Sequence, residues 1–156
     1  MITGKFIAGN GDLAEAYGLR EKIFGEELGY PKENVRDEYD ARAIHALLYD
    51  DEHKPAATGR LYIDNDGYWH LGYVCVRKEL RGNQLGDLVM RMILDKAISA
   101  GAGFFRLDAE KDAEGFCRIY GFVPYGEENG KLVPMEATKE SIVAAVFSGC
   151  RGDQFV

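Results

Sequence analysis

The residues best placed to bind a ligand gather where an apolar strand pattern runs through a basic turn into a helix. Residues 73–76 are β-forming, residues 77–81 include three cations, and an amphipathic helical pattern follows. The first turn of a helix offers unpaired backbone N–H groups, and the helix dipole favours an anion there. Gly82 and Gly86 leave the backbone bare, so phosphate can approach closely. The stretch predicts a pyrophosphate site, to which Arg81 adds a charge-assisted hydrogen bond.

A second glycine-containing stretch, residues 9–14 (GNGDLA), fits the pattern G-x-G-x-x-[GA] that binds dinucleotides. The apolar run before it is only about four residues long, and parallel βαβ repeats do not follow. Asp12 would also place a negative charge beside a pyrophosphate. We therefore interpret this stretch as a turn in which Asp12 caps the next helix.

Hydrophobic periodicity predicts the elements that position the basic turn. The order is β-α-β-β-β-α-β-α-β followed by a further helix, which predicts a mixed α/β sheet with helices on its faces. Strands are expected at residues 5–8, 43–49, 56–63, 68–76, 104–109, from 122 and at 132–136. Helices are expected from Asp12 to about Leu28, with Leu28 on the apolar stripe, and at 85–100, with Leu88 on the apolar stripe. Two more are expected at 112–120 and after a Thr138 cap.

Composition narrows the class of protein. The chain has 156 residues, 46% of them apolar, and a net charge of −7, which favours one folded domain without repeats. So acidic a chain is a poor partner for nucleic acid or an anionic membrane. Three scattered cysteines and three histidines without zinc-ligand spacing predict neither disulfides nor a metal site. With no apolar leader pattern, we expect a cytoplasmic protein.

Several motifs together resemble the GNAT N-acetyltransferases. Residues 81–86 (RGNQLG) are similar to that family's acyl-CoA signature [QR]-x-x-G-x-[GA], and residues 116–122 (FCRIYGF) to its segment F-Y-x-x-x-G-F. The ElaA-like branch is suggested by residues 20–24 (REKIF), 38–40 (EYD), His45, 57–61 (ATGRL) and Met135. The resemblance runs in order over about residues 5–137. It implies a GNAT domain at 1–137, with a C-terminal helix and tail at 138–156.

The resemblance implies direct transfer of an acetyl group from acetyl-CoA to a primary amine of a small molecule or peptide. The pantetheine arm is expected along the strand that ends at Val76, and the pyrophosphate at the basic turn. The positions expected to bind the co-substrate are Val74, Cys75, Val76, Arg81, Gly82, Asn83, Gln84, Leu85, Gly86 and Asp87. Homodimers are common in the family, and the apolar face of the C-terminal helix suggests a contact surface.

The acceptor amine must lose a proton before it attacks, so a base is needed. His70, Asp108 and Glu110 are the candidates, each with an ordinary alternative as a core histidine or a solvated acid. Substrate contacts are expected from the segment that holds Arg20, Glu38, Asp40 and His45: the acids would bind a cationic amine, unless Arg20 and His45 instead orient the loop.

Two positions depart from the family pattern. Gln84 stands where the signature usually has glycine, and Cys117 stands where many members have the tyrosine that protonates the departing CoA thiolate. A thiol can donate a proton, but a buried, inert cysteine is the alternative. These departures leave open a second hypothesis, a non-catalytic acyl-CoA-binding or regulatory module of the same fold.

Overall fold

The computed structural model describes residues 1–128 and 130–147. The chain forms two compact units. Unit 1 comprises Met1–Tyr62 and Leu71–Ala97, and unit 2 comprises Ile63–His70 and Ile98–Val156. The tail of the predicted C-terminal segment, from residue 148 onward, lies outside the described residues.

Seven strands form one mixed sheet in the order β1-β2-β3-β4-β5-β7-β6. The pairs β1–β2, β2–β3, β5–β7 and β6–β7 are antiparallel, whereas β4 and β5 pair in parallel through Trp69 and His70 of β4. This confirms the predicted mixed α/β fold. The strands are β1 (Thr3–Ala8), β2 (Ile44–Tyr49), β3 (Pro55–Ile63), β4 (Trp69–Val76), β5 (Phe104–Glu110), β6 (Val123–Pro124) and β7 (Leu132–Thr138).

The helices include two π-helical segments. The α-helices are α1 (Ala14–Arg20), α2 (Leu85–Ser99), α3 (Glu114–Ile119) and α4 (Lys139–Ile142), and the π-helices are η1 (Glu21–Glu27) and η6 (Val143–Phe147). Short 3-10 turns are η2 (Lys32–Asn34), η3 (Glu38–Arg42), η4 (Lys78–Leu80) and η5 (Lys111–Ala113).

The helix expected from Asp12 to Leu28 changes its winding halfway. Asp12 accepts a hydrogen bond from the N–H of Ala14 at 3.0 Å, but the N-cap residue of α1 is Leu13, without a side-chain cap, so the predicted Asp12 cap is wrong. After Arg20 the chain winds as the π-helix η1, and the N–H of Leu28 reaches the carbonyl five residues back, on Ile23. Wider turns shift the phase of the side chains. Leu28, expected on the apolar stripe, is therefore 44% exposed.

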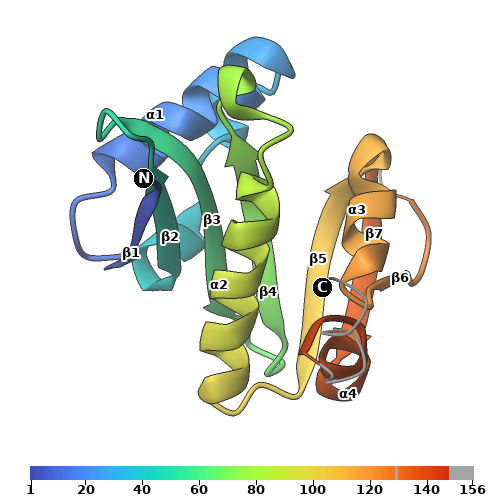
Figure 1. Ribbon diagram of the computed structural model, residues 1–156. Coiled ribbons are helices and arrows are strands. Elements are labelled where there is room, and N and C mark those ends of the chain that lie inside the picture. Colours follow the sequence, from blue (N-terminus) through green and yellow to red (C-terminus); the bar gives the residue numbers. More distant parts are fainter. Residues whose placement is uncertain (129, 148–156) are drawn as a thin grey trace. The chain divides into compact units, whose positions relative to one another are not determined.

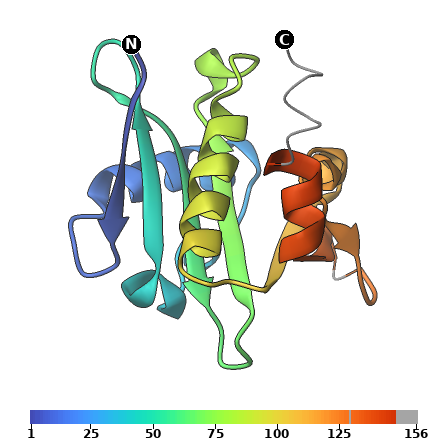
Figure 2. The same ribbon diagram turned by 60° about the horizontal axis from the view of Figure 1, so that its bottom comes forward.

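Unit 1 is layered, with helices on both faces of its strands (Figures 1 and 2). Successive residues of a strand point to opposite faces. Leu47 of β2 joins the cluster of Leu19, Ile23 and Phe24 from α1 and η1. On the other face, a Cβ at Gly59 of β3 would meet Val89 of α2 at 2.5 Å. Glycine at this position therefore allows the close approach of α2 to β3.

Unit 2 contains a sheet with one buried and one polar face. Along β5, Phe105, Leu107 and Ala109 are buried, whereas Arg106 and Asp108 lie on the opposite face. At the end of β7, Thr138 forms the predicted cap: its side chain accepts from the N–H of Ser141 at 3.1 Å. Ile142 and Val146 of the C-terminal helix are buried.

Within residues 1–128 and 130–147, no helix is long and apolar enough to cross a membrane.

Candidate acyl-CoA site

Tyr73, in the middle of β4, has a left-handed backbone with φ +50°. A bulky residue adopts this conformation only when its surroundings hold it there, and such strain concentrates at functional sites. The guanidinium carbons of Arg20 and Arg60 lie 4.2 and 4.7 Å from the centroid of the Tyr73 ring. Its hydroxyl donates to the carbonyl of Asn34 at 2.8 Å. The distortion comes directly before Val74, where the co-substrate was expected.

The two arginines that face Tyr73 share one buried carboxylate. Nη1 of Arg20 and Nη1 of Arg60 donate to Oδ1 of Asp40, at 2.8 and 3.0 Å. Arg60 also pairs with Asp37. Burial alone would raise the pKa of the Asp40 carboxyl, but the charge and hydrogen bonds of the arginines and the N–H of Asp37 hold that pKa below its usual value. The carboxylate thus stays ionised inside unit 1.

His45 completes this cluster in a single tautomer. Arginine has only N–H donors, so Nδ1 of His45 must accept from Nη2 of Arg20 at 3.1 Å. Its Nε2 then carries the proton and donates to the backbone carbonyl of Asp40, also at 3.1 Å. Burial lowers the pKa of His45, and the positive charge of Arg20 lowers it further, against the opposing effect of the Asp40 carbonyl. The ring is therefore neutral.

The structure brings Arg20, Asp40 and His45 together and leaves Glu38 apart from them. The first three are buried, and their mutual contacts fit the loop-orienting role expected for Arg20 and His45. Glu38 is exposed at the beginning of η3. Of the expected acids, Glu38 therefore has the accessible carboxylate, whereas Asp40 is occupied by arginines. Arg60 and Tyr73 belong to the same cluster, although neither was predicted as a site residue; Arg60 lies in the segment 57–61 that resembles the ElaA-like branch.

The turn before α2 contains two left-handed residues. Gly82 has φ +86° and Gln84 has φ +63°. A Cβ at Gly82 would have no heavy atom within 4 Å, so the space beside its backbone is open. Alternating backbone conformations in such turns direct N–H groups towards an anion. The left-handed conformation at residue 84 explains why the family usually has glycine there. Gln84, which replaces that glycine, therefore has a strained backbone.

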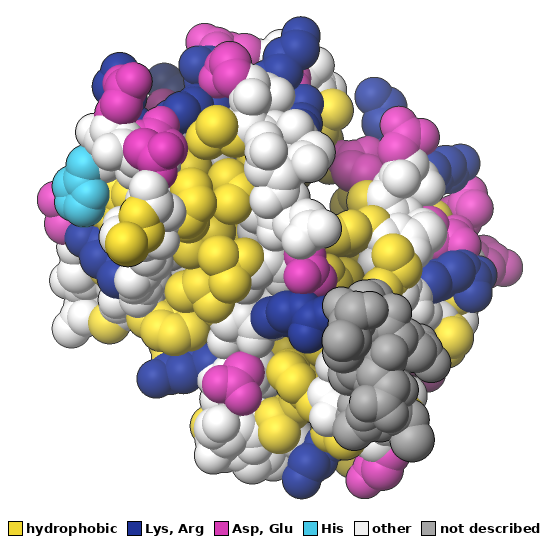
Figure 3. All heavy atoms as spheres, viewed as in Figure 1, with side chains coloured by type: hydrophobic (Ala, Val, Ile, Leu, Met, Phe, Trp, Pro, Cys, Tyr) yellow, Lys and Arg dark blue, Asp and Glu magenta, His cyan; other side chains and the backbone are white. Residues whose placement is uncertain are grey.

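The cations of this turn are largely paired. Arg77 bonds to Asp50 and to the carbonyl of Pro55, and this holds the pKa of Asp50 at about 2. Nε of Arg81 donates to the carbonyl of Val76 at 3.0 Å, and Nη2 donates to Glu27 at 2.9 Å. Figure 3 accordingly shows positive and negative side chains interspersed at this end of unit 1. The backbone N–H groups of the turn, more than its side-chain charges, are therefore left to form the anion site that the sequence predicts here.

The remaining expected positions have structural contacts of their own. Asn83 donates from Nδ2 to the carbonyl of Leu80 at 3.0 Å, and Asp87 accepts from Arg91 at 2.9 Å. Leu85 is buried at the start of α2. Cys75 is buried in β4, and burial raises the pKa of its thiol to about 12, so it remains protonated. Of these side chains, Asn83 thus stabilises the turn, whereas Asp87 is paired within α2 and Leu85 and Cys75 are buried.

The four candidate catalytic residues all belong to unit 2. His70 contacts Asp64 through Nε2 at 2.8 Å. Asp108 is exposed, whereas Oε1 of Glu110 is buried without a hydrogen-bond partner among the described residues. Cys117 is buried in α3, and this burial, together with Glu114, raises the pKa of its thiol to about 11. Asp108 has the most accessible basic group of the four.

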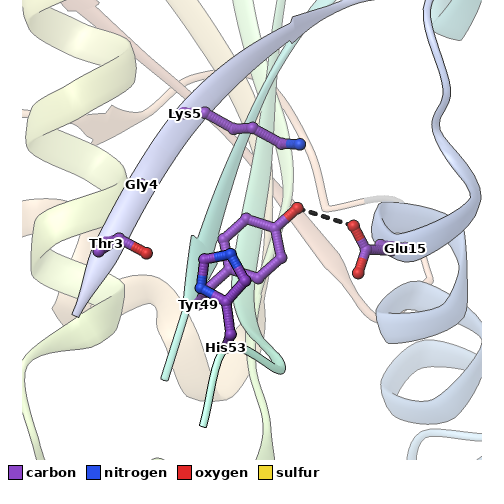
Figure 4. Close-up of a pocket in the computed structure, with 6 residues that line it drawn as sticks. All are labelled: Thr3, Gly4, Lys5, Glu15, Tyr49 and His53. Atoms are coloured by element: carbon purple, nitrogen blue, oxygen red, sulfur yellow. Dashed lines mark hydrogen bonds between the residues drawn. The ribbon is translucent and has the colours of Figure 1, made fainter. Parts of the chain in front are cut away.

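A cavity of about 480 Å³ opens elsewhere in unit 1 (Figure 4). The Tyr49 hydroxyl donates to Glu15 at 2.7 Å, and the ring of His53 stacks on Tyr49 with centroids 4.9 Å apart. Thr3, Gly4 and Lys5 complete the lining. None of the predicted site residues lines this cavity.

Comparison with known proteins points to the family that the motifs suggested. Residues 13–122 match the family described as "Acetyltransferase (GNAT) family". The Bacillus subtilis protein named "Uncharacterized N-acetyltransferase YjcF" is 34% identical over 110 residues, covering 70% of this chain and 77% of its own.

Solved structures share the fold at lower identity. ElaA of Escherichia coli is 23% identical with a TM-score of 0.78, and the comparison covers 88% of this chain and 99% of ElaA. An acyl-CoA N-acyltransferase from Pseudomonas aeruginosa is 21% identical with a TM-score of 0.80, covering 88% and 100%. The matched region includes β4, the turn and α2. The chain belongs to the acetyltransferase (GNAT) family of acyltransferases.

Proposed function

We propose that the protein is an acetyl-CoA-dependent N-acetyltransferase that transfers the acetyl group directly to a primary amine of a small molecule or peptide. The observation that carries the proposal is the turn before α2, where Gly82 and Gln84 are left-handed and the backbone of Gly82 is open. This arrangement suits the pyrophosphate of a CoA ester, and it lies in the segment that resembles the family's signature.

Each part of the chain has a role in this proposal. The backbone of Val74, Cys75 and Val76 binds the pantetheine arm, and residues 81–87 hold the pyrophosphate. The co-substrate supplies an activated thioester, whose carbonyl is polarised by backbone N–H groups of β4. The Arg20–Arg60–Asp40 cluster keeps Tyr73 in its left-handed conformation and so fixes the direction of the backbone that follows.

Deprotonation of the acceptor amine falls to an accessible base, and the exposed carboxylate of Asp108 fits this best. His70 and Glu110 stay predictions for the same role. For Cys117, a pKa of about 11 argues against donation of a proton to the CoA thiolate. The CoA sulfur then leaves as the thiolate when the C–S bond breaks, and it takes its proton afterwards from solvent or from another group.

Gly82→Val tests the proposal. Valine at φ +86° is strained and fills the open space where the phosphate would lie. We expect the affinity for acetyl-CoA, measured by calorimetry, to fall at least tenfold. Gly101→Val is the matched control, because Gly101 is also left-handed (φ +97°) with open space around it, but comes after the C-terminal end of α2. Equal acetyl-CoA affinity in the two variants would contradict the proposal.

Catalysis itself is tested by CoA release across a panel of amines. Turnover with any amine excludes a purely non-catalytic acyl-CoA-binding module. Binding without turnover across the panel would favour that module instead.

Location and assembly belong to the same proposal. The acidic composition and the cysteine usage support a cytoplasmic enzyme. A homodimer through the C-terminal helix stays a prediction. Ile142 and Val146 are buried within this chain, while Phe147 is 40% exposed. Sedimentation of a chain that ends at Ala137 tests this prediction. If the truncated protein has the same number of chains per particle as the full chain, the helix is not the dimer contact.

A further inference from the structure

Arg106 on the polar face of β5 is held by two aromatic rings of unit 2. Its guanidinium carbon lies 3.7 Å from the centroid of the Tyr68 ring and 4.6 Å from that of Tyr125. Tyr68 precedes β4, and Tyr125 follows β6, where its N–H is bonded to the carbonyl of Pro134. Stacking on aromatic faces fixes the plane of a guanidinium but does not use its N–H donors.

These donors are not satisfied within the described part of the chain. Nε of Arg106 is buried and has no hydrogen-bond partner there. Oε2 of Glu136 forms an ion pair with Nε at 3.7 Å, but this distance is too long for a hydrogen bond. No hydrogen bond from the Arg106 side chain to another described residue is present. A rigid, partly exposed cation with unused donors is suited to bind a planar anion.

Acidic residues surround this cation on the same face. Asp108 follows two residues later on β5 and is exposed, and Glu136 lies opposite Arg106 in the β5–β7 register. A phosphate with two negative charges is disfavoured beside these carboxylates. A ligand with one carboxylate and one ammonium group matches both signs of charge.

We propose that this face of unit 2 binds the acceptor and that Arg106 recognises a carboxylate on it through paired N–H···O bonds. The acceptor class is an amine that carries a carboxylate, such as a free amino acid. Asp108 and Glu136 then bind the amino end. This inference rests on the proposed N-acetyltransferase function and specifies its substrate class.

Matched pairs of amines test the inference. Lysine and cadaverine, tyrosine and tyramine, and phenylalanine and phenethylamine differ only by the carboxylate. We expect kcat/KM, measured by CoA release, to favour the amino acid of each pair by about 10- to 100-fold, the range for charge-assisted hydrogen bonds. Preference for the decarboxylated amine in the unaltered protein would overturn the inference, without any variant.

Arg106→Met should reduce that preference to less than about threefold while leaving the affinity for acetyl-CoA unchanged. Arg106→Lys keeps the charge but loses the paired donors. Its preference for the amino acid should therefore lie between that of the unaltered protein and that of Arg106→Met. Arg118→Met is the matched control, because Arg118 is an exposed arginine of unit 2 that pairs with Glu114. A folded Arg106→Met protein that keeps the full preference contradicts the inference.

Direct binding separates this inference from the proposed function. Amino acids are titrated into the protein saturated with CoA and followed by calorimetry. Binding that depends on Arg106, without CoA release from acetyl-CoA, would support the carboxylate subsite and remove the transferase proposal. Turnover of simple amines without any preference for carboxylates would support the transferase proposal and remove the carboxylate subsite.

Discussion

Glu27 accepts a hydrogen bond from Nη2 of Arg81 at 2.9 Å, which joins the π-helix η1 to the turn before α2 across 54 residues of chain. The only arginine of the acyl-CoA signature is thus partly neutralised by a carboxylate of another element. Its Nε is also bonded, to the carbonyl of Val76. Arg81 therefore braces the turn as much as it offers charge to a ligand.

The first prediction concerns this pair. Glu27→Gln removes a negative charge beside the proposed pyrophosphate site, while Arg81 keeps its bond to Val76. We expect acetyl-CoA to bind roughly 2- to 10-fold more tightly at low salt, with little change in stability, because a partly exposed ion pair contributes at most about 1 kcal/mol. Calorimetry at two salt concentrations measures this. Weaker binding would instead show that Glu27 is needed to position Arg81.

Gln84 is the second test. Its backbone is left-handed, φ +63°, which costs a non-glycine residue roughly 1–2 kcal/mol. Gln84→Gly should raise the free energy of unfolding by roughly 0.5–1 kcal/mol, since relief of strain is partly offset by greater freedom of the unfolded chain. Thermal denaturation measures the change, with Gln84→Ala as the control that keeps the strain. If alanine stabilises as much as glycine, strain at this position is not the cause.

The third prediction is a pH dependence that arises at His45. Because folding lowers the pKa of His45, the unfolded chain binds a proton more readily below its ordinary pKa of about 6.5. The free energy of unfolding should therefore fall as the pH drops below about 6.5, until the lowered pKa of the folded state is reached. Urea denaturation between pH 5 and 8 measures this slope.

A matched pair of variants assigns the slope to its residue. His45→Asn keeps an acceptor near Nη2 of Arg20 but cannot be protonated, so its stability should depend less on pH in this range. His53→Asn removes an exposed histidine and should keep the slope of the unaltered protein. Loss of the slope in the second variant only would refute the assignment.

Local patterns predicted most of the elements, and long-range contacts determined the rest. The Thr138 cap and the signature position at Gln84 depend on neighbours in sequence, so their geometry followed from residue type. The π-helical winding of η1 and the pairing of Arg81 with Glu27 depend on packing between distant segments, which no periodicity records. The stripe expected on α2 was partly wrong for a similar reason. Leu88 is 39% exposed, whereas Met90, which was not expected on the stripe, is buried.

The role predicted for the acidic residue Asp40 was wrong. Because the chain has a net negative charge and residues 37–40 form an acidic loop, we expected the carboxylates of this loop to be free to bind an amine. Asp40 is instead buried between two arginines, since a buried arginine requires a nearby anion. Sequence alone cannot tell which acid of residues 37–40 turns inward. Tyr73, Arg60 and Glu27 were missed because each owes its position to residues more than ten places away.

Cys117 carries the last prediction. Burial raises the pKa of its thiol to about 11, above the value of about 8.5 for an unperturbed cysteine thiol. Cys117 is therefore a weaker acid than an unperturbed thiol and is poorly suited to protonate a CoA thiolate. Cys117→Ala should change kcat by less than about threefold and leave the alkaline limb of the pH–rate profile in place. A loss of tenfold or more in kcat, with rescue by Cys117→Tyr, would instead identify Cys117 as the proton donor.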